Sequence, residues 1–309
     1  MRIETIRLWE NRDDVELTTF LNADDPYLKI KRKRPAIISV PGGAYQTCPR
    51  QGNEGDPVAM AFAIDGYQAF VLEYSNATKA PAGKALFPAQ TVDMAKAILT
   101  IKEHADEWDI DPEQISIVGF SAGSHVCAMY ATTYNTENKE MLTEKFGCKV
   151  EDLSIMSALC IYGLHDYVLQ EQFNAEHQNF MSDGKANEPT FGAAHPDEAV
   201  LKKYSPVVQA SKNMPPMFLA HALNDGLVPA MHTIKMAEKL QELQVPFECH
   251  LFQYGDHGFA LGRNVFEPWK DSLTHDAAAW LPLAKQFLQH QIDDTTLVKE
   301  ENPFKDMPF

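Results

Sequence analysis

The stretch Ile-Ser-Ile-Val-Gly-Phe-Ser-Ala-Gly, residues 115–123, joins a short apolar run to a Gly-x-Ser-x-Gly motif. An apolar helical pattern follows directly, from Ala122 to Thr133. In this context the motif predicts a tight strand–helix turn, with Gly119 and Gly123 where larger side chains would collide. Ser121 would then be exposed at the helix N-terminus, whose dipole favours negative charge. The motif therefore predicts a nucleophilic serine; the alternative is a Gly-rich turn with an incidental serine.

Short apolar runs and amphipathic patterns alternate on both sides of this motif. Parallel strands that are buried on both faces are typically such unbroken apolar runs, and helices connect them. The sequence therefore predicts an α/β fold with a mostly parallel central sheet and helices on both faces. The expected strands are residues 36–40, 69–72, 115–118, 157–162, 217–220 and 247–253, after two or three short strands within 1–29; the expected helices are 57–63, 87–104, 122–133, 229–243 and 274–291, and Asp111-Pro112 is an expected turn.

Residues 163–214 interrupt the alternation. The segment has weak periodicity and many Asn, Gly, Pro and Asp residues, and it is too long for a plain connection. We predict a small cap-like insertion over the strand ends that contributes to the substrate site. The whole chain, 1–309, is expected to form a single domain that includes this insertion, with a polar tail after Ile292 that is frayed or docked on the surface.

A nucleophilic serine needs a base and an acid that orients the base. On a strand–helix–strand scaffold of this kind the chain order is Ser, then Asp or Glu, then His. Asp225 follows the run 217–220, and His257 follows the run 247–253. Both residues are thus expected at the C-terminal ends of strands, the edge where open α/β sheets bind ligands.

The other histidines fit these roles less well. His221, at a strand end, is expected to be packed there or to shape the pocket, and His125, on the helix after Ser121, is expected in the core or on the surface. His165 and His195 lie in the insertion and are weaker candidates for substrate contact, and Asp256 should point away if His257 faces the serine. No spacing of His with acidic residues indicates a metal site, and no cofactor is expected.

Acyl transfer also needs backbone N–H groups that face the developing oxyanion. One is expected from Ala122, directly after the nucleophile. A second is expected from the loop Pro41-Gly42-Gly43-Ala44-Tyr45, where glycine lets the backbone approach closely. The alternative is an ordinary Pro-Gly turn without function.

Together these motifs resemble the α/β-hydrolase fold, specifically the lipase/esterase branch that is similar to acetyl-xylan and feruloyl esterases and, more distantly, to hormone-sensitive lipase. The matching segments, within about residues 30–290, are 40–45, 119–123, 204–206, 224–229 and 256–259. The resemblance implies Ser121 as nucleophile, His257 as base and Asp225 as orienting acid. It also implies that Gly42 or Gly43 forms the oxyanion hole with Ala122, although many relatives have His-Gly-Gly-Gly where this chain has Pro41-Gly42-Gly43-Ala44.

The resemblance implies a serine carboxylesterase that hydrolyses small, short-acyl esters, with acetylated sugars as one class, through an acyl-enzyme. Tyr45, the insertion and Phe259 are expected to shape the substrate pocket. Two alternatives stay open: a serine peptidase on the same fold, and a non-catalytic ligand-binding protein. Many relatives are dimers, so a homodimer is one possible assembly, although no apolar stripe in the chain argues for it.

Composition and charge narrow the class of partner. The formal net charge is −16, which disfavours nucleic acid and anionic membranes as partners. No run of apolar residues is long enough to span a bilayer, and the charged N-terminus has no apolar core of a secretory signal. The cysteines are odd in number and widely spaced, which favours free thiols in a reducing compartment. We therefore expect a cytoplasmic protein that acts on a small-molecule ester.

Overall fold

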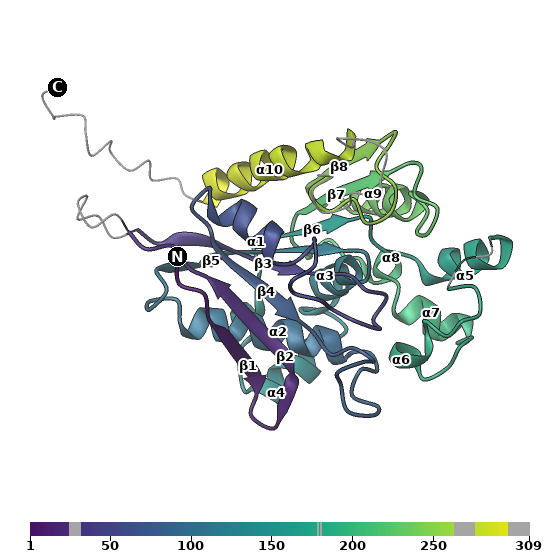
Figure 1. The fold of residues 1–309 in the computed structure, drawn as a ribbon, viewed down its shortest axis with the longest axis horizontal. Helices are drawn as coiled ribbons and strands as arrows, with labels where there is room; N and C mark the ends of the chain where they lie inside the picture. Colours follow the sequence, from purple (N-terminus) through teal and green to yellow (C-terminus); the bar gives the residue numbers. More distant parts are fainter. Residues whose placement is uncertain (25–31, 178, 180, 263–275, 296–309) are drawn as a thin grey trace, which may run out of the picture.

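The structure is a computed structural model that describes residues 1–24, 32–177, 179, 181–262 and 276–295 (Figure 1). Its centre is an eight-stranded sheet with the order β1-β2-β4-β3-β5-β6-β7-β8. The first two strands pair antiparallel, β2 pairs antiparallel with β4, and all later neighbours are parallel. The strands are β1 (Thr5–Trp9), β2 (Arg12–Phe20), β3 (Arg34–Val40), β4 (Gln68–Glu73), β5 (Ile110–Phe120), β6 (Ser157–Ile161), β7 (Met217–Ala222) and β8 (Phe247–Phe252).

Both faces of the sheet are covered, and the side-chain alternation of the strands explains how. Ile37 and Ile38 are adjacent in β3, yet each belongs to a different buried cluster. The cluster of Ile37 contains residues of α1 (Asp56–Ala63) and α10 (Trp280–Thr295), which lie on one side of the sheet (Figure 1). The cluster of Ile38 contains residues of α2 (Ala89–Glu103), α3 (Ala122–Thr133) and α9 (Met231–Leu243). The predicted mostly parallel sheet with helices on both faces is confirmed.

The differences from the sequence prediction are local. Asp111-Pro112 is not a turn but lies within β5, which starts at Ile110 because Arg34 of β3 pairs there. Two elements were not predicted, α4 (Lys139–Phe146) and the short 3-10 helix η1 (Val150–Leu153). The closing helix is preceded by a 3-10 turn, η2 (Asp276–Ala279), and continues to Thr295, past the predicted start of the tail. Residues 274–275 of the predicted helix, 25–29 of the N-terminal strand region and 296–309 of the tail lie outside the described residues.

The cap segment, which we define as residues 163–214 between β6 and β7, consists mainly of short helices. These are α5 (Tyr167–Glu176), α6 (Glu188–Phe191), α7 (Glu198–Lys203) and α8 (Pro206–Gln209). In Figure 1, α5, α6 and α7 project at the end of the molecule opposite the N-terminus. A small apolar cluster of its own, which includes Leu164, Tyr167 and Leu201, joins the segment to Val228 in the loop after β7. The cap segment is therefore anchored beside the strand ends.

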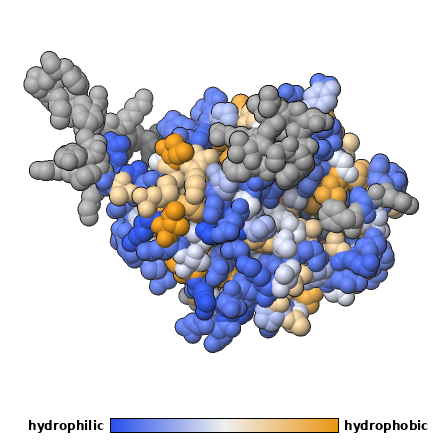
Figure 2. Space-filling view, in the orientation of Figure 1, coloured by the Kyte–Doolittle hydropathy of each residue, from blue (hydrophilic) through white to orange (hydrophobic). Residues whose placement is uncertain are grey.

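The surface in Figure 2 is mostly hydrophilic, with hydrophobic residues in small separate groups. None of the helices in the described ranges is both long enough and apolar enough to cross a bilayer.

Candidate active site

Ser121 occupies the sharp turn between β5 and α3. Its φ of 51° is unusual for a residue with a side chain and stores of order 1–3 kcal/mol of strain. Both flanking glycines are required by contact with backbone: a Cβ on Gly119 would lie 2.3 Å from the carbonyl oxygen of Gly123, and one on Gly123 would lie 2.0 Å from that of Val40. The turn therefore packs against the neighbouring strand β3, which holds Ser121 at the strand ends.

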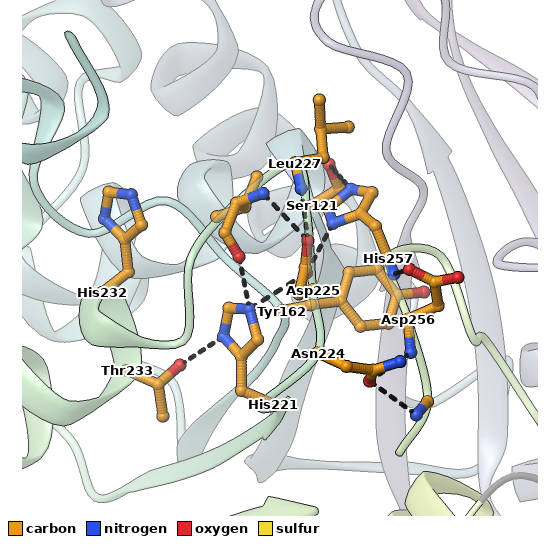
Figure 3. Close-up of polar contacts among 12 residues, drawn as sticks. Ser121, Tyr162, His221, Asn224, Asp225, Leu227, His232, Thr233, Asp256 and His257 are labelled. Atoms are coloured by element: carbon orange, nitrogen blue, oxygen red, sulfur yellow. Dashed lines mark hydrogen bonds and ion pairs between the residues drawn. The ribbon is translucent and has the colours of Figure 1, made fainter. Parts of the chain in front are cut away.

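His257 connects Ser121 to Asp225. Its Nε2 lies 2.9 Å from Ser121 Oγ, and its Nδ1 lies 2.8 Å from Asp225 Oδ2 (Figure 3). The carboxylate can only accept, so Nδ1 carries the proton and Nε2 is free to accept from the serine hydroxyl. The three residues come from the loops that follow β5, β7 and β8, as the sequence order predicted. The structure thus brings the predicted nucleophile, base and acid into one hydrogen-bonded line.

The carboxylate of Asp225 is buried and held from several directions. The backbone N–H groups of Leu227 and Val228 each donate to Oδ1 at 2.9 Å, and His221 Nε2 lies 3.1 Å from Oδ2. Burial alone would raise the pKa of Asp225, but the hydrogen bonds from His221 and His257 outweigh it and hold that pKa well below its usual value. The carboxylate is therefore ionised and has a fixed orientation toward His257.

His221 is also part of the site. The sequence prediction described this residue only as packed at a strand end or as shaping the pocket. Its side chain is buried at the end of β7. Nε2 donates to the carbonyl oxygen of Val228 at 2.9 Å as well as to Asp225, and Nδ1 accepts from the Thr233 hydroxyl at 2.8 Å. The two acceptors at Nε2 thus fix the tautomer that supports Asp225, and the Thr233 hydroxyl then donates to Nδ1. The available signal was its place four residues before the acid, at the end of the same strand.

The loop of residues 41–45 lies beside Ser121, but its two glycines differ. The N–H of Gly42 donates to Glu54 Oε2 at 2.7 Å, so Gly42 is already engaged. Gly43, Ala44 and Ala122 line the cavity at Ser121. In the described part of the chain no acceptor lies at the amides of Gly43 and Ala44, and Ala122 is the first residue of α3, where the N–H has no acceptor within the helix. This geometry corrects the candidate set for the oxyanion donors from Gly42, Gly43 and Ala122 to Gly43, Ala44 and Ala122.

Glu54 was not singled out from the sequence, although it also lines the cavity. Its Oε1 accepts from the Tyr162 hydroxyl at 2.7 Å, and the same hydroxyl accepts from the N–H of Ala260 at 3.1 Å. The ring of Tyr162 lies edge-on to that of His257, with 5.2 Å between centroids. Glu54 therefore joins the 41–45 loop to the end of β6 and, through Tyr162, to the loop that carries His257.

A cavity of about 380 Å³ opens at Ser121 and His257. The 41–45 loop, including Tyr45, forms one part of its wall, and the cap segment and the loop after β7 form the rest. The cap segment contributes Leu164, Tyr167, Gln170, Asn174, Met181, Ala186 and Asn187, and the loop after β7 contributes Leu227 and Val228. The predicted contribution of the insertion to this cavity is thereby located on α5 and the residues around α6.

Two predicted pocket residues have different positions. Tyr45 lines the cavity, but its hydroxyl is hydrogen-bonded to His125 Nδ1 and lies 3.2 Å from the carbonyl oxygen of Ala122, so its polar end is engaged in the interior. Phe259 is buried and packs against Tyr162 at 4.5 Å between ring centroids; it does not line the described cavity. Phe259 is thus a support for the Tyr162 ring, which corrects its prediction as a substrate contact.

His125, His165, His195 and Asp256 lie outside the cavity wall. His125 is buried and donates to the carbonyl oxygen of Tyr204 at 2.7 Å, and burial lowers its pKa to about 4. His165 is also buried, and His195 is exposed near Glu171. Neither residue lines the cavity, so their expected contact with substrate is not supported. Asp256 accepts from its neighbour's backbone N–H and points away from Ser121 (Figure 3). Among the described residues, no three His, Cys, Asp or Glu side chains gather closely enough to hold a metal ion.

Known proteins share the sequence pattern and the fold. The BD-FAE family matches residues 25–240 of the chain. Endo-1,4-beta-xylanase B of Butyrivibrio fibrisolvens is 27% identical over 250 residues, which are 81% of this chain and 35% of the relative. The probable carboxylic ester hydrolase LipM of Mycobacterium tuberculosis is 25% identical over 239 residues, 74% of this chain and 51% of the relative. The chain thus spans about half or less of the length of these curated relatives.

A solved structure covers the chain almost completely. MGS-M1, described as an alpha/beta hydrolase enzyme from a Medee basin deep-sea metagenome library, is 27% identical with a TM-score of 0.70. The likeness covers 95% of this chain and 98% of that one. The cap segment and the central sheet therefore both fall within the shared architecture.

Proposed function

The chain belongs to the BD-FAE family and has the α/β-hydrolase fold, and from this premise we propose that it is a serine carboxylesterase that hydrolyses small, short-acyl esters. The observation that carries the proposal is the hydrogen-bonded line from Ser121 Oγ through His257 to the buried carboxylate of Asp225, at 2.9 Å and 2.8 Å. That line ends at a cavity large enough for a small ester.

The geometry supports the following reaction. His257 Nε2 accepts the hydroxyl proton as Ser121 Oγ attacks the ester carbonyl carbon, and the amides of Ala122 with Gly43 or Ala44 stabilise the oxyanion. The tetrahedral intermediate collapses, the alcohol leaves with the proton from His257, and the acyl group stays on Ser121. Water then attacks the acyl carbon while His257 takes its proton, and that proton passes to Ser121 Oγ as the bond from Oγ to the acyl carbon breaks and the carboxylic acid is released. Asp225 holds the imidazole in the required tautomer throughout.

The size of the cavity supports a short acyl group. At about 380 Å³ it lies near the lower end of the range for small-molecule sites. Its wall combines apolar side chains, such as Leu164 and Met181, with the carboxamides of Gln170, Asn174 and Asn187. Acetylated sugars are one class of ester that such a mixed wall would accept.

Two alternatives are separated by activity. A serine peptidase would hydrolyse p-nitroanilides of short peptides, and a non-catalytic binder would gain stability from ligands without turnover. The small cavity beneath the cap segment favours an ester over a folded polypeptide substrate.

The test is hydrolysis of p-nitrophenyl acetate, butyrate and octanoate by the wild type and by Ser121→Ala. We expect the two shorter esters to be the better substrates and the variant to lose kcat by about 10⁶-fold. Labelling by a fluorophosphonate, present in the wild type and absent in the variant, identifies the nucleophile independently. Faster cleavage of the p-nitroanilides than of every ester would replace the esterase with a peptidase, and unlabelled, inactive wild type would contradict both.

A further inference from the structure

One face of α5 forms part of the cavity wall. Tyr167, Gln170 and Asn174 recur at steps of three and four residues, so they lie on the same side of the helix. All three are the buried residues of α5, and all three line the cavity that holds Ser121. Two of them carry carboxamides, which are costly to bury without hydrogen-bond partners. The hydrogen-bond partners of these two amides therefore determine how each amide is oriented.

The residue behind them is His232, which is buried in α9. Its Nδ1 faces two backbone donors, the N–H groups of His165 at 3.2 Å and Asp166 at 3.1 Å. Because Nδ1 must accept from both, the ring proton is on Nε2. Burial holds the pKa of His232 well below its usual value, so the ring is neutral. Nε2 lies 2.9 Å from Gln170 Oε1 and donates to it.

The hydrogen bond from His232 then determines which atoms of Gln170 and Asn174 donate and which accept. Since Gln170 Oε1 accepts from His232, its Nε2 is the donor, to Asn174 Oδ1 at 2.9 Å and to the carbonyl oxygen of Leu227 at 3.0 Å. Asn174 Oδ1 is therefore the acceptor, and Nδ2 is the group left over. We call His232, Gln170 and Asn174 the cap chain. It begins at the backbone N–H groups of His165 and Asp166, and each member accepts a hydrogen bond from the group before it.

The last group of the cap chain has no hydrogen-bond partner among the residues that the structure describes. Asn174 is 8% exposed, and none of the described residues accepts a hydrogen bond from its Nδ2. Nδ2 is nevertheless not among the polar atoms that are both sealed from solvent and unpartnered. An oriented amide donor in a mostly buried residue of the cavity wall is a group that a ligand acceptor would satisfy.

We propose that Asn174 is a specificity-determining residue, whose Nδ2 donates to an acceptor oxygen on the substrate away from the scissile ester. The substrate class is then an ester with an ether, hydroxyl or carbonyl oxygen in its acyl or alcohol part, in preference to a purely alkyl ester. The proposal rests on the proposed esterase function and deepens it. A substrate without such an oxygen leaves the donor unpaired and excludes water from it, which is unfavourable.

The comparison site for this donor is Asn187 in the same cavity wall. Its Nδ2 donates to Glu171 Oε1 at 2.9 Å and to the carbonyl oxygen of Ala194 at 3.0 Å, so both of its N–H groups are used. Asn187 therefore contributes a carboxamide to the cavity without a free donor. Replacement of Asn187 controls for changes in the size and polarity of the wall.

The experiment uses esters in matched pairs that differ by one oxygen in place of a methylene. The acyl series pairs p-nitrophenyl butyrate with p-nitrophenyl methoxyacetate. It extends to pairs with longer acyl chains, in which the ether oxygen lies one position further from the ester carbonyl. The alcohol series pairs propyl acetate with 2-hydroxyethyl acetate and extends likewise. Each kcat/KM is divided by the rate constant of hydroxide-catalysed hydrolysis of the same ester, which removes differences in intrinsic reactivity. The enzymes are the wild type, Asn174→Leu, the isosteric Asn174→Asp and Asn187→Leu.

We expect the wild type to prefer the oxygen-containing member of at least one pair by about 10-fold, from one hydrogen bond of ordinary strength. Both Asn174 variants should lose that preference, mainly through KM, and Asn187→Leu should keep it. The absence of a preference in every pair, its persistence in Asn174→Asp, which has no donor, or an equal loss in Asn187→Leu would overturn the proposal. Hydrolysis of p-nitrophenyl acetate reports separately on the proposed function, because an inactive wild type would contradict the esterase rather than the role of Asn174.

Discussion

Two chains of hydrogen bonds reach the same cavity. The triad chain, which consists of Asp225, His257 and Ser121, begins at the N–H groups of Leu227 and Val228. The cap chain begins at the N–H groups of His165 and Asp166. Both pass through a histidine whose tautomer is set by its neighbour. They differ in what they present at the end: the triad chain ends in a nitrogen that can accept a proton from Ser121, and the cap chain ends in a donor, Asn174 Nδ2.

The difference follows from charge. The triad chain contains an ionised carboxylate, and the fixed negative charge of Asp225 favours a positive imidazole during the reaction. The cap chain consists of neutral groups only, since burial keeps His232 uncharged. One wall is therefore suited to move a proton, and the other is suited to recognise a neutral oxygen atom. Substitutions in each chain test this difference.

Asp225→Asn breaks the triad chain. The amide can donate to His257 Nδ1 and thereby stabilise the wrong tautomer, so kcat should fall by about 10⁴-fold while the fold is kept. Steady-state kinetics on p-nitrophenyl acetate measures the loss, and the preference among the oxygen-containing esters should not change. A variant that keeps a tenth of the wild-type kcat would show that the contacts of Asp225 are structural only.

Glu54→Ala removes the hydrogen bonds that join the 41–45 loop, through Tyr162, to the loop that carries His257. The substitution changes no residue of the triad chain or the cap chain. The N–H of Gly42 and the hydroxyl of Tyr162 lose an acceptor, and displacement of the neighbouring amides by about 1 Å should lower kcat by about 10²-fold, with little change in KM. Phenyl- or alkylboronate inhibitors, which mimic the tetrahedral adduct, should bind more weakly in proportion. Glu54→Gln keeps one acceptor oxygen and should retain more of the activity. A loss confined to KM would contradict a role in positioning the oxyanion donors.

His232→Leu breaks the cap chain at its start. Two buried backbone N–H groups and Gln170 Oε1 lose their partner, so the free energy of unfolding should fall by about 2 kcal/mol or more. Urea denaturation measures this change. The matched control is His165→Leu, because His165 is equally buried and neither of its ring nitrogens has a hydrogen-bond partner in the described part of the chain. Equal destabilisation by both substitutions would mean that the hydrogen bonds of His232 contribute nothing beyond packing.

The buried histidines also predict sensitivity to acid. Burial, followed by the neighbouring His221 and His125, lowers the pKa of His165 to about 3, against about 6.5 in an unfolded chain. Below about pH 6.5 the unfolded state binds a proton that the folded state does not, so the free energy of unfolding falls by about 1.4 kcal/mol per pH unit for this residue until the folded pKa is reached.

His165→Leu should therefore reduce the loss of stability between about pH 7.5 and pH 5.0 by about 2 kcal/mol relative to the wild type. Urea denaturation at the two pH values, with the wild type in parallel, measures the difference. An unchanged dependence on pH would mean that His165 is protonated in the folded protein.

The triad chain could be predicted from the sequence because each member follows a recognisable apolar run. Ser121 lies directly after β5, and Asp225 and His257 lie in the loops that follow β7 and β8; parallel strands bring these ends to one edge of the sheet. Periodicity also predicted which helices pack on the sheet. It missed the extension of β5 through Asp111-Pro112, because register with Arg34 of β3 outweighs the local turn preference of that dipeptide.

The cap chain and the link through Glu54 could not be predicted in this way. Gln170 and His232 are separated by 62 residues, and Glu54 and Tyr162 by 108, and no motif in the sequence marks either pair as partners. Likewise the sequence offered Gly42 and Gly43 equally as oxyanion donors, and only the contact with Glu54 distinguishes them. Phe259 was predicted to shape the pocket, whereas its ring packs against Tyr162.

The positions of the strands along the chain, the tight turn at Ser121 and the candidates for the reacting groups thus follow from local pattern, since glycine spacing and strand ends are properties of short segments. The direction in which each amide and imidazole points depends on partners that are distant in the chain. Those partners meet only when the sheet and the cap segment pack together, because hydrogen-bond polarity is set by three-dimensional contact and not by neighbours in sequence. Tertiary structure therefore decided that Asn174 offers its N–H groups, rather than its oxygen, to the cavity.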